Sequence, residues 1–462
     1  MRGIINMENK RLLSIDIFRG LTVILMTIVN NPGDWGHIYA PLEHAEWHGY
    51  TLTDLVFPSF LFIVGISTVL SKPSQDQLLK IFKRALRIFL LGLSLSFFSK
   101  IKAGDYTLVV RLLAMALATI AFLGDYPLRR QFWVAVGAFV LLIGLCFSGL
   151  TDFESVRIPG VLQRIAVVYL LVSLLHAYTS LRVQIGVFIA CLVGYWALMS
   201  FVEVPGIGAA NLEVNKNLAA WLDNYLLEGH LWASAKTWDP EGILSTLPAL
   251  ATGLAGLFAG RYLQGSPERV SPEGVSPEGG SPEGDSPEGG SPEASSPKGD
   301  SPEASSPKGD SPEGMSPRGQ SPKASVLFAV GAIALVAGTV WGWYFPINKA
   351  LWTSSYVLVA AGWDLLLLAV LQATVHSDRY WKPVLIYGMN PMLVFFFSGI
   401  IPRVLGMIKI GEEGLTSWIY SHGIEPIFAD KINASLAGAL IYVLIWAAIL
   451  AFFDRQKRYY KV

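Results

Sequence analysis

The chain contains 462 residues, of which 52% are hydrophobic and only 15% are charged, a composition typical of an integral membrane protein. Lys plus Arg and Asp plus Glu each number 35, and no basic stripe indicates a nucleic-acid partner. Because Cys146 and Cys191 both lie in apolar runs, we expect neither a disulfide nor a thiolate metal site.

Apolar runs of roughly 20 residues, the length that crosses a bilayer as a helix, recur along the chain. We expect an all-α fold, a polytopic membrane helix bundle of about 12 transmembrane helices. The predicted spans are 13–31, 53–71, 81–99, 106–123, 132–149, 160–178, 184–202, 243–263, 326–343, 351–372, 383–400 and 434–453. Lys and Arg gather at both termini and in alternate loops, which predicts cytoplasmic termini. The remaining loops then face outward, at 32–52, 150–159, 203–242, 344–350 and 401–433.

A low-complexity segment over 266–325 repeats the pentapeptide Ser-Pro-Glu-Gly-x. A proline at every fifth position forbids a helix, and the segment lacks the apolar residues of a core. We therefore expect a disordered cytoplasmic insert that divides a membrane domain into a first part, 1–265, and a second part, 326–462. Repeat expansion in a tolerant loop explains this segment better than a phosphorylatable Ser-Pro tether does.

Residues 43–54 are rich in titratable side chains and lead directly into an apolar run. Asp54 lies about one turn inside that run, where an unpaired carboxylate costs several kcal/mol, so we expect a partner or a function for it. His44 and His48 have the spacing of metal-binding helical histidines, but Gly49 follows and no third ligand is evident. Histidine titrates near neutral pH, so beside carboxylates it suits proton transfer or nucleophilic attack as well as a structural role. This stretch is the candidate chemical centre.

Polar residues also interrupt the first predicted span. Asp16 and Arg19 are neighbours on one helix face, which predicts a structural ion pair; alternatively, Arg19 binds an anionic group such as a phosphate. Asn30 ends the span on the outer side, where it either caps the helix or donates a hydrogen bond to a developing oxyanion.

The later spans carry polar clusters at their outer ends. These clusters contain Arg157, Gln163, Arg164, Asp239, Glu241, Asn348 and Lys349. Arg164 lies within membrane depth, where it needs a cavity or a partner, and Asp54 lies at a suitable depth to be that partner. Asn390 precedes Pro391, which interrupts another span. Together the clusters predict an outward-facing cavity ringed by helix ends.

In chain order, these clusters resemble those of the heparan-alpha-glucosaminide N-acetyltransferase family, which consists of multispanning membrane acetyltransferases. The matching segments are 14–20, 29–30, 44–58, 156–164, 239–244 and 346–352, with 388–390 as a weaker seventh. The resemblance implies transfer of an acetyl group from acetyl-CoA to an amine of a sugar or glycan at the extracytoplasmic face. It also implies that His44 is catalytic, with Asn30 beside it. Two additional predicted spans and the insert fit a bacterial-type relative in the inner (cell) membrane.

Acetyl transfer from a thioester needs a base for the amine and hydrogen-bond donors for the tetrahedral oxyanion. We assign His44 as general base or transient acetyl acceptor and Asn30 as oxyanion donor. Asp54 either orients an imidazole or pairs with Arg164.

A buried cationic cleft would suit the pyrophosphate of CoA, and Arg157, Arg164 and Lys349 are candidates to form it. The full set of candidate substrate- and CoA-binding residues is Arg19, Arg157, Gln163, Arg164, Asp239, Glu241, Asn348, Lys349 and Asn390. The expected partners are an amino-sugar or glycan acceptor and membrane lipid, with a homo-oligomer left open and no metal cofactor.

A secondary transporter of a small polar or sugar-like solute is the alternative, because the predicted spans and the intramembrane Asp54 and Arg164 fit that class too. Against it, the two halves of the sequence show no similarity, and no pair of Gly- or Pro-broken spans occupies matching positions. A non-enzymatic scaffold would leave the outer polar clusters without explanation. The acetyltransferase interpretation is therefore favoured.

Overall fold

This computed structural model describes residues 7–71, 76–119, 152–265 and 322–459, together with isolated positions between 121 and 149. Most of the predicted span over 132–149, and nearly all of the repeat insert, lie outside the described residues. A helix begins at Pro322, near the start predicted for the second part of the membrane domain. All elements described below belong to one compact unit, which contains residues from both sides of the insert.

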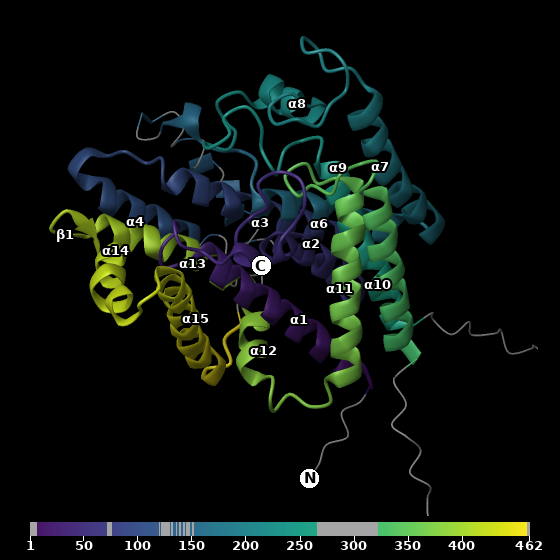
Figure 1. Cartoon of the computed structure of the whole chain (residues 1–462). Coiled ribbons are helices and arrows are strands. Elements are labelled where there is room, and N and C mark those ends of the chain that lie inside the picture. The colour runs from purple at the N-terminus through teal and green to yellow at the C-terminus, as the bar shows by residue number, and fades with distance from the viewer. Residues whose placement is uncertain are drawn as a thin grey trace, which may run out of the picture. The chain divides into compact units, whose positions relative to one another are not determined.

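Long helices form the body of this unit (Figure 1). They are α1 (Met7–Asn30), α2 (Leu52–Leu70), α3 (Gln77–Phe98), α6 (Val161–Tyr178), α7 (Leu181–Phe201), α9 (Thr246–Gln264), α10 (Pro322–Trp341), α11 (Ser354–Thr374) and α15 (Lys431–Arg455). The shorter helices are α4 (Thr107–Ala118), α8 (Leu218–Leu227), α12 (Lys382–Met389), α13 (Pro391–Met407) and α14 (Leu415–Ile419). Among the described residues, the one sheet is a hairpin of β1 (Lys409–Ile410) and β2 (Glu413–Gly414), paired antiparallel with Lys409 opposite Gly414. The described part of the chain is thus helical, as predicted.

Seven helices within the described ranges are long and apolar enough to cross a membrane, whereas the sequence predicts twelve spans. They contain the stretches Leu13–Asn30, Leu52–Leu70, Val161–Tyr178, Leu181–Phe201, Lys323–Trp341, Ser354–Thr374 and Lys431–Arg455. α12 and α13 would make an eighth, but the chain bends by 82° at Asn390 and Pro391, because proline has no N–H with which to continue a helix. α3 and α9 have sufficient length but are less apolar, and α4, in the region predicted as a span over 106–123, has only 12 residues.

α9 is one of the most enclosed long helices, since it contacts α2, α6, α7 and α11 and most of its residues are buried. Glycines let its backbone approach α2 closely. A Cβ added to Gly256 would lie 1.9 Å from the carbonyl oxygen of Phe62, and one added to Gly65 would lie 2.0 Å from that of Gly253. Interfaces between membrane helices commonly use small residues in this way. The modest hydropathy of α9 therefore reflects packing against protein instead of contact with lipid.

Loops predicted to face outward converge at one end of the unit. A parallel bridge joins Gly49 to Asn348. The amide of Ile158 donates to the carbonyl oxygen of His230 at 2.9 Å. In Figure 1, α8 and its neighbouring loops lie at the same end of the unit as the purple loop between α1 and α2. Segments that are far apart in the sequence are thus assembled where the polar clusters occur.

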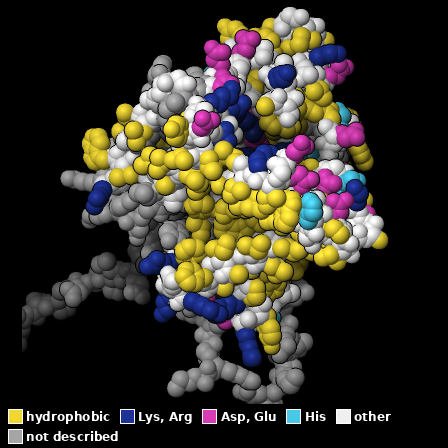
Figure 2. Space-filling model, turned by 90° about the vertical axis from the view of Figure 1, so that its left-hand side faces the viewer, with side chains coloured by type: hydrophobic (Ala, Val, Ile, Leu, Met, Phe, Trp, Pro, Cys, Tyr) yellow, Lys and Arg dark blue, Asp and Glu magenta, His cyan; other side chains and the backbone are white. Residues whose placement is uncertain are grey.

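One face of the molecule carries a broad band of hydrophobic side chains (Figure 2). Lys and Arg side chains predominate below this band, whereas Asp, Glu and His side chains gather at its upper end together with further Lys and Arg side chains. A lipid-exposed surface between two aqueous interfaces requires a band of this kind.

Candidate active site

A histidine–aspartate pair forms within residues 43–54. Nδ1 of His44 lies 2.6 Å from Oδ1 of Asp54. The Asp54 side chain is 1% exposed, whereas that of His44 is 60% exposed. A carboxylate only accepts hydrogen bonds, so Nδ1 carries a proton, and in the neutral imidazole Nε2 then presents a lone pair. The pair therefore leaves a basic nitrogen on a side chain that is open to solvent.

Asp54 is itself held in place by several donors. Its Oδ2 accepts hydrogen bonds from the amides of Ala45 and Thr51, each at 3.0 Å, and from the Thr51 hydroxyl at 3.2 Å. The contact from the Thr51 amide belongs to a capping box at the start of α2. The hydroxyl of Tyr356 on α11 donates to the main-chain oxygen of Asp54 at 2.5 Å. The carboxylate that orients His44 is therefore fixed by its own loop, by α2 and by α11.

The second histidine of this loop has a different partner. Nδ1 of His48 lies 3.3 Å from Nδ2 of Asn348, so the amide donates to the ring. Asn348 is fully buried, and its Oδ1 accepts a hydrogen bond from the Leu351 amide at 2.8 Å. His44 and His48 thus have different hydrogen-bond partners. Over the part of the chain that the structure describes, no three His, Cys, Asp or Glu side chains form a group able to hold a metal ion.

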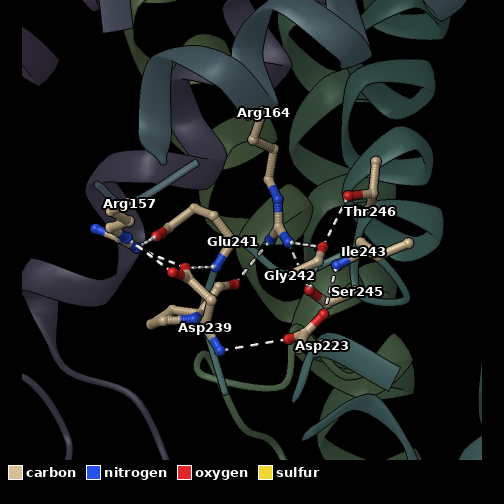
Figure 3. A network of polar contacts seen from close by, with 10 residues as sticks. Arg157, Arg164, Asp223, Asp239, Glu241, Gly242, Ile243, Ser245 and Thr246 are labelled. Carbon is tan, nitrogen blue, oxygen red and sulfur yellow. Dashed lines mark hydrogen bonds and ion pairs between the residues drawn. The ribbon is translucent and has the colours of Figure 1, made fainter. Parts of the chain in front are cut away.

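A second polar network joins the segment before α6 to the loop before α9 (Figure 3). Arg157 donates from Nε to Oδ2 of Asp239 at 2.8 Å and from Nη2 to Oδ1 at 2.5 Å, and Nη2 also contacts Glu241. Burial opposes the charge of Arg157, but Glu241 and Asp239 raise its pKa above the ordinary value. Burial raises the pKa of Asp239; it acts in the same direction on Glu241, but Arg157 and other nearby cations hold the pKa of Glu241 below its ordinary value.

Arg164 contacts the same loop from α6 (Figure 3). Nη1 donates to the carbonyl oxygen of Pro240 at 3.0 Å, and Nη2 donates to that of Gly242 at 2.8 Å and to the Ser245 hydroxyl at 2.5 Å. The predicted pairing of Arg164 with Asp54 is therefore wrong. Depth in the membrane suggested that partner, but the direction of the side chain takes the guanidinium to loop carbonyls instead.

Asp223 of α8 completes the network, although no motif in the sequence identifies it. Its carboxylate accepts hydrogen bonds from the amides of Ile243 at 2.8 Å and Asp239 at 3.3 Å. A Cβ on Gly242 would lie 1.9 Å from Oδ2 of Asp223, so the close approach requires glycine. Burial raises the pKa of Asp223 to about 6, although the two amides favour its ionised form. The only signal in the sequence is a lone acid among the apolar residues of a short helix.

Two further residues were predicted at the outer ends of spans. Lys349 is half-buried beside Asn348 and has no ion pair in the described ranges. Its charge contributes to the low pKa of Glu241. Asn30 is exposed as the last residue of α1, and no hydrogen bond joins it to His44 among the described residues.

Arg19 lies away from this end of the molecule. Its Nη1 donates to Oδ1 of Asp16 at 2.8 Å and to the carbonyl oxygen of Gly388 at 3.2 Å. Nη2 donates to the Ser67 hydroxyl at 3.0 Å. About 16 Å of helix separates Arg19 from Asn30. Arg19 therefore forms the structural ion pair with Asp16 and also binds α12 through the carbonyl oxygen of Gly388.

Gln163 and Asn390 are both buried in the bundle. Gln163 packs against α3, where a Cβ on Gly92 would lie 2.4 Å from its Oε1. Its Nε2 has no hydrogen-bond partner in the described part of the chain. Asn390 lies at the break between α12 and α13, where its main-chain N–H donates to the carbonyl oxygen of Tyr387 at 3.1 Å.

The sequence matches a family model described as "Heparan-alpha-glucosaminide N-acetyltransferase, catalytic" over residues 11–274, more than half of the chain. The chain belongs to this family. The heparan-alpha-glucosaminide N-acetyltransferase of Homo sapiens is 25% identical over 430 residues, which cover 83% of this chain and 52% of that protein. The Mus musculus protein of the same name is 24% identical over 432 residues, which cover 83% and 53%. The chain thus spans about half the length of the curated relatives it matches.

The heparan-alpha-glucosaminide N-acetyltransferase match contains most of the described site. His44 and Asp54 lie within the matched residues, as do Arg157 and Asp239, whereas Asn348 lies beyond them. The family membership predicted from the motifs is confirmed, and the apolar helices make this member a membrane protein.

Proposed function

We propose that this protein transfers an acetyl group from acetyl-CoA to an amine of a sugar or glycan at the extracytoplasmic face of a membrane. Family membership supports acetyl transfer, and the names of the two relatives suggest the class of acceptor. The observation that carries the proposal is the His44–Asp54 pair, in which a buried carboxylate orients an exposed imidazole. The distribution of Lys and Arg supports an orientation with both termini in the cytoplasm.

In this reaction, Nε2 of His44 accepts a proton from the attacking amine. The amine nitrogen bonds to the thioester carbonyl carbon, the carbon–sulfur bond breaks, and CoA leaves as a thiolate that takes up the proton. Asp54 stabilises the imidazolium because the Nδ1–H bond to Oδ1 becomes charge-assisted. The same nitrogen could instead carry the acetyl group transiently, in which case His44 acts as the nucleophile.

Asn30 is the proposed donor to the oxyanion, since its exposed amide has no hydrogen bond with another described residue. Lys349 is the proposed ligand for a CoA phosphate, because it is a half-buried cation beside the site and is outside every ion pair of the described ranges. Arg157 and Arg164 donate their hydrogen bonds to the loop before α9. We therefore assign those two arginines to holding the loop, and not to direct contact with CoA.

His44→Ala tests the proposal. With labelled acetyl-CoA and glucosamine supplied to full-length protein in vesicles, we expect acetyl transfer to fall roughly 10²- to 10⁴-fold while insertion and folding are retained. His37→Ala is the matched control, because Nδ1 of His37 lies 2.6 Å from Oδ2 of Asp34 in the same outer loop. Near-normal transfer by His44→Ala would remove the assignment. Uptake of a solute without an acetylated product would support the transporter alternative.

A further inference from the structure

Pro58 leaves one main-chain oxygen at the start of α2 without its helical partner. It lies inside α2, and because proline has no N–H, it cannot donate to the carbonyl oxygen of Asp54, four residues earlier. The hydroxyl of Tyr356 on α11 donates to that oxygen instead, at 2.5 Å. The first turn of α2, which carries the Asp54 carboxylate, is therefore bonded to a second helix.

The ring of Tyr356 is held in place by Trp352. Both side chains are fully buried, and their ring centroids lie 5.5 Å apart at an interplanar angle of 86°. Trp352 also meets the ring of Phe57 on α2, at 4.9 Å and 78°. Edge-to-face contacts of this kind are favourable between aromatic rings. Nε1 of Trp352 donates to the Thr252 hydroxyl on α9 at 3.2 Å, so the Tyr356 hydroxyl has little freedom to move away from α2.

The backbone of Trp352 is strained. Its φ of +55° lies in the left-handed region, which is unfavourable for a bulky side chain. Strain of this kind persists only where the surrounding contacts impose it, and it clusters at functional sites. The guanidinium carbon of Arg164 lies over the Trp352 ring, 5.2 Å from its centroid. Trp352 thus lies between Arg164, which holds the loop before α9, and Tyr356, which holds Asp54.

We propose that Tyr356 is a positioning residue, which holds the His44–Asp54 pair in the orientation needed for acetyl transfer by binding the main-chain oxygen of Asp54. Trp352 extends this link to Arg164. The inference rests on the proposed function and adds to it a residue that acts on the reaction without touching the substrate. The effect can be large, because a misplacement of about 1 Å in a reacting group can lower a rate roughly 100-fold.

The alternative is that Tyr356 only satisfies a buried carbonyl oxygen, which would cost stability if it were left unpaired. Pro58→Ala separates the two roles. The alanine N–H can donate to the carbonyl oxygen of Asp54 within α2. In this background, Tyr356→Phe no longer leaves that oxygen unpaired, but it still removes the bond between α2 and α11.

The test measures kcat with glucosamine, KM for acetyl-CoA and Tm for the full-length protein. Tyr356→Phe should lower kcat roughly 10- to 100-fold with little change in KM, because the lost interaction acts on the chemical step. It should also lower the Tm. In the Pro58→Ala background, Tyr356→Phe should lower kcat again, whereas the Tm should fall much less.

Tyr387→Phe is the matched control. The Tyr387 side chain is 1% exposed, and its hydroxyl donates to the carbonyl oxygen of Val443 at 2.5 Å, so the substitution removes the same kind of bond. Tyr387 belongs to α12, which lies at the opposite end of the unit from α8 in Figure 1. This variant should lower the Tm and leave kcat unchanged.

The proposal is overturned if Tyr356→Phe keeps the kcat of the wild type. It is also overturned if Tyr356→Phe no longer lowers kcat in the Pro58→Ala background, since Tyr356 would then only satisfy the carbonyl oxygen.

The rate at which diethylpyrocarbonate modifies His44, followed by mass spectrometry, is a readout that does not depend on acetyl transfer. The reagent acylates a neutral imidazole nitrogen, and a ring that Asp54 orients and polarises should react faster. We expect Tyr356→Phe to slow the modification of His44 roughly threefold or more. The modification of His37, which has its own partner in Asp34, should be unchanged.

This readout separates failure of the inference from failure of the proposed function. Slower modification of His44 in Tyr356→Phe, in a protein whose wild type transfers no acetyl group, would sustain the positioning role and refute the acetyltransferase. Acetyl transfer by the wild type, with kcat and His44 modification both unchanged in Tyr356→Phe, would do the reverse.

Discussion

Replacing Asp54 with asparagine separates two roles of the same carboxylate. Oδ2 accepts hydrogen bonds from Ala45 and Thr51, and an amide oxygen can keep them. The amide NH2 then takes the place of Oδ1 and donates to Nδ1 of His44. Nδ1 consequently loses its proton and Nε2 gains one, so the imidazole offers no base on its exposed side.

We expect Asp54→Asn to lower kcat roughly 10²- to 10⁴-fold, the contribution of a general base. The hydrogen bonds are kept but no longer involve a charged group, and this change should lower the free energy of unfolding by about 1 to 2 kcal/mol. The assay is acetyl transfer to glucosamine at saturating acetyl-CoA, with thermal unfolding measured in parallel. Thr51→Ala is the control, because it removes the hydroxyl contacts with Asp54 and with the carbonyl oxygen of Glu43 but leaves the His44 tautomer unchanged. A kcat for Asp54→Asn within about tenfold of wild type would refute the tautomer argument.

Three further predictions concern stability. Gly256→Ala places a Cβ 1.9 Å from a backbone oxygen of α2 and should lower the Tm. Gly186→Ala on α7 is the control, because no atom lies within 4 Å of the added Cβ, and it should leave the Tm unchanged. Equal Tm values for the two variants would contradict the packing argument. Arg157→Ala leaves two buried carboxylates unpaired and should cost about 3 to 5 kcal/mol in denaturant unfolding, part of which Arg157→Lys recovers. Because Asp223 has a folded pKa of about 6, above its unfolded value, the folded protein binds this proton more tightly. Its contribution to stability is therefore present below about pH 4 and is lost as pH rises to about 6, by about 3 kcal/mol at most. Asp223→Asn should flatten that part of the Tm-against-pH curve, and an unchanged curve would exclude the assignment.

Part of the site follows from short-range rules. Asp54 needed a partner because a buried carboxylate is costly, and the partner, His44, is only ten residues away. The capping box is also encoded locally, by Thr51 and Asp54. Such contacts are predictable because the chain between the two groups is too short to place them far apart.

Other contacts depend on which elements meet. Depth alone paired Arg164 with Asp54, but the rotation of α6 and the path of the loop before α9 supply carbonyl oxygens instead. Asp223 could not be recognised, since its partners are backbone amides about 20 residues away in sequence. The sequence predicted about twelve spans, whereas seven described helices are long and apolar enough to cross a membrane. α9 is not among the seven, because its small residues serve helix packing and not contact with lipid.

The amino-acid sequence by itself determined that this is a helical membrane protein of the acetyltransferase family with polar groups clustered at helix ends. These features depend on composition, periodicity and the cost of burying charge, which act over a few residues. Only the tertiary structure decided that Trp47 meets Trp238, that His48 meets Asn348, and that the arginines bind a loop. Long-range contacts are chosen by helix orientation and packing, which no local pattern specifies.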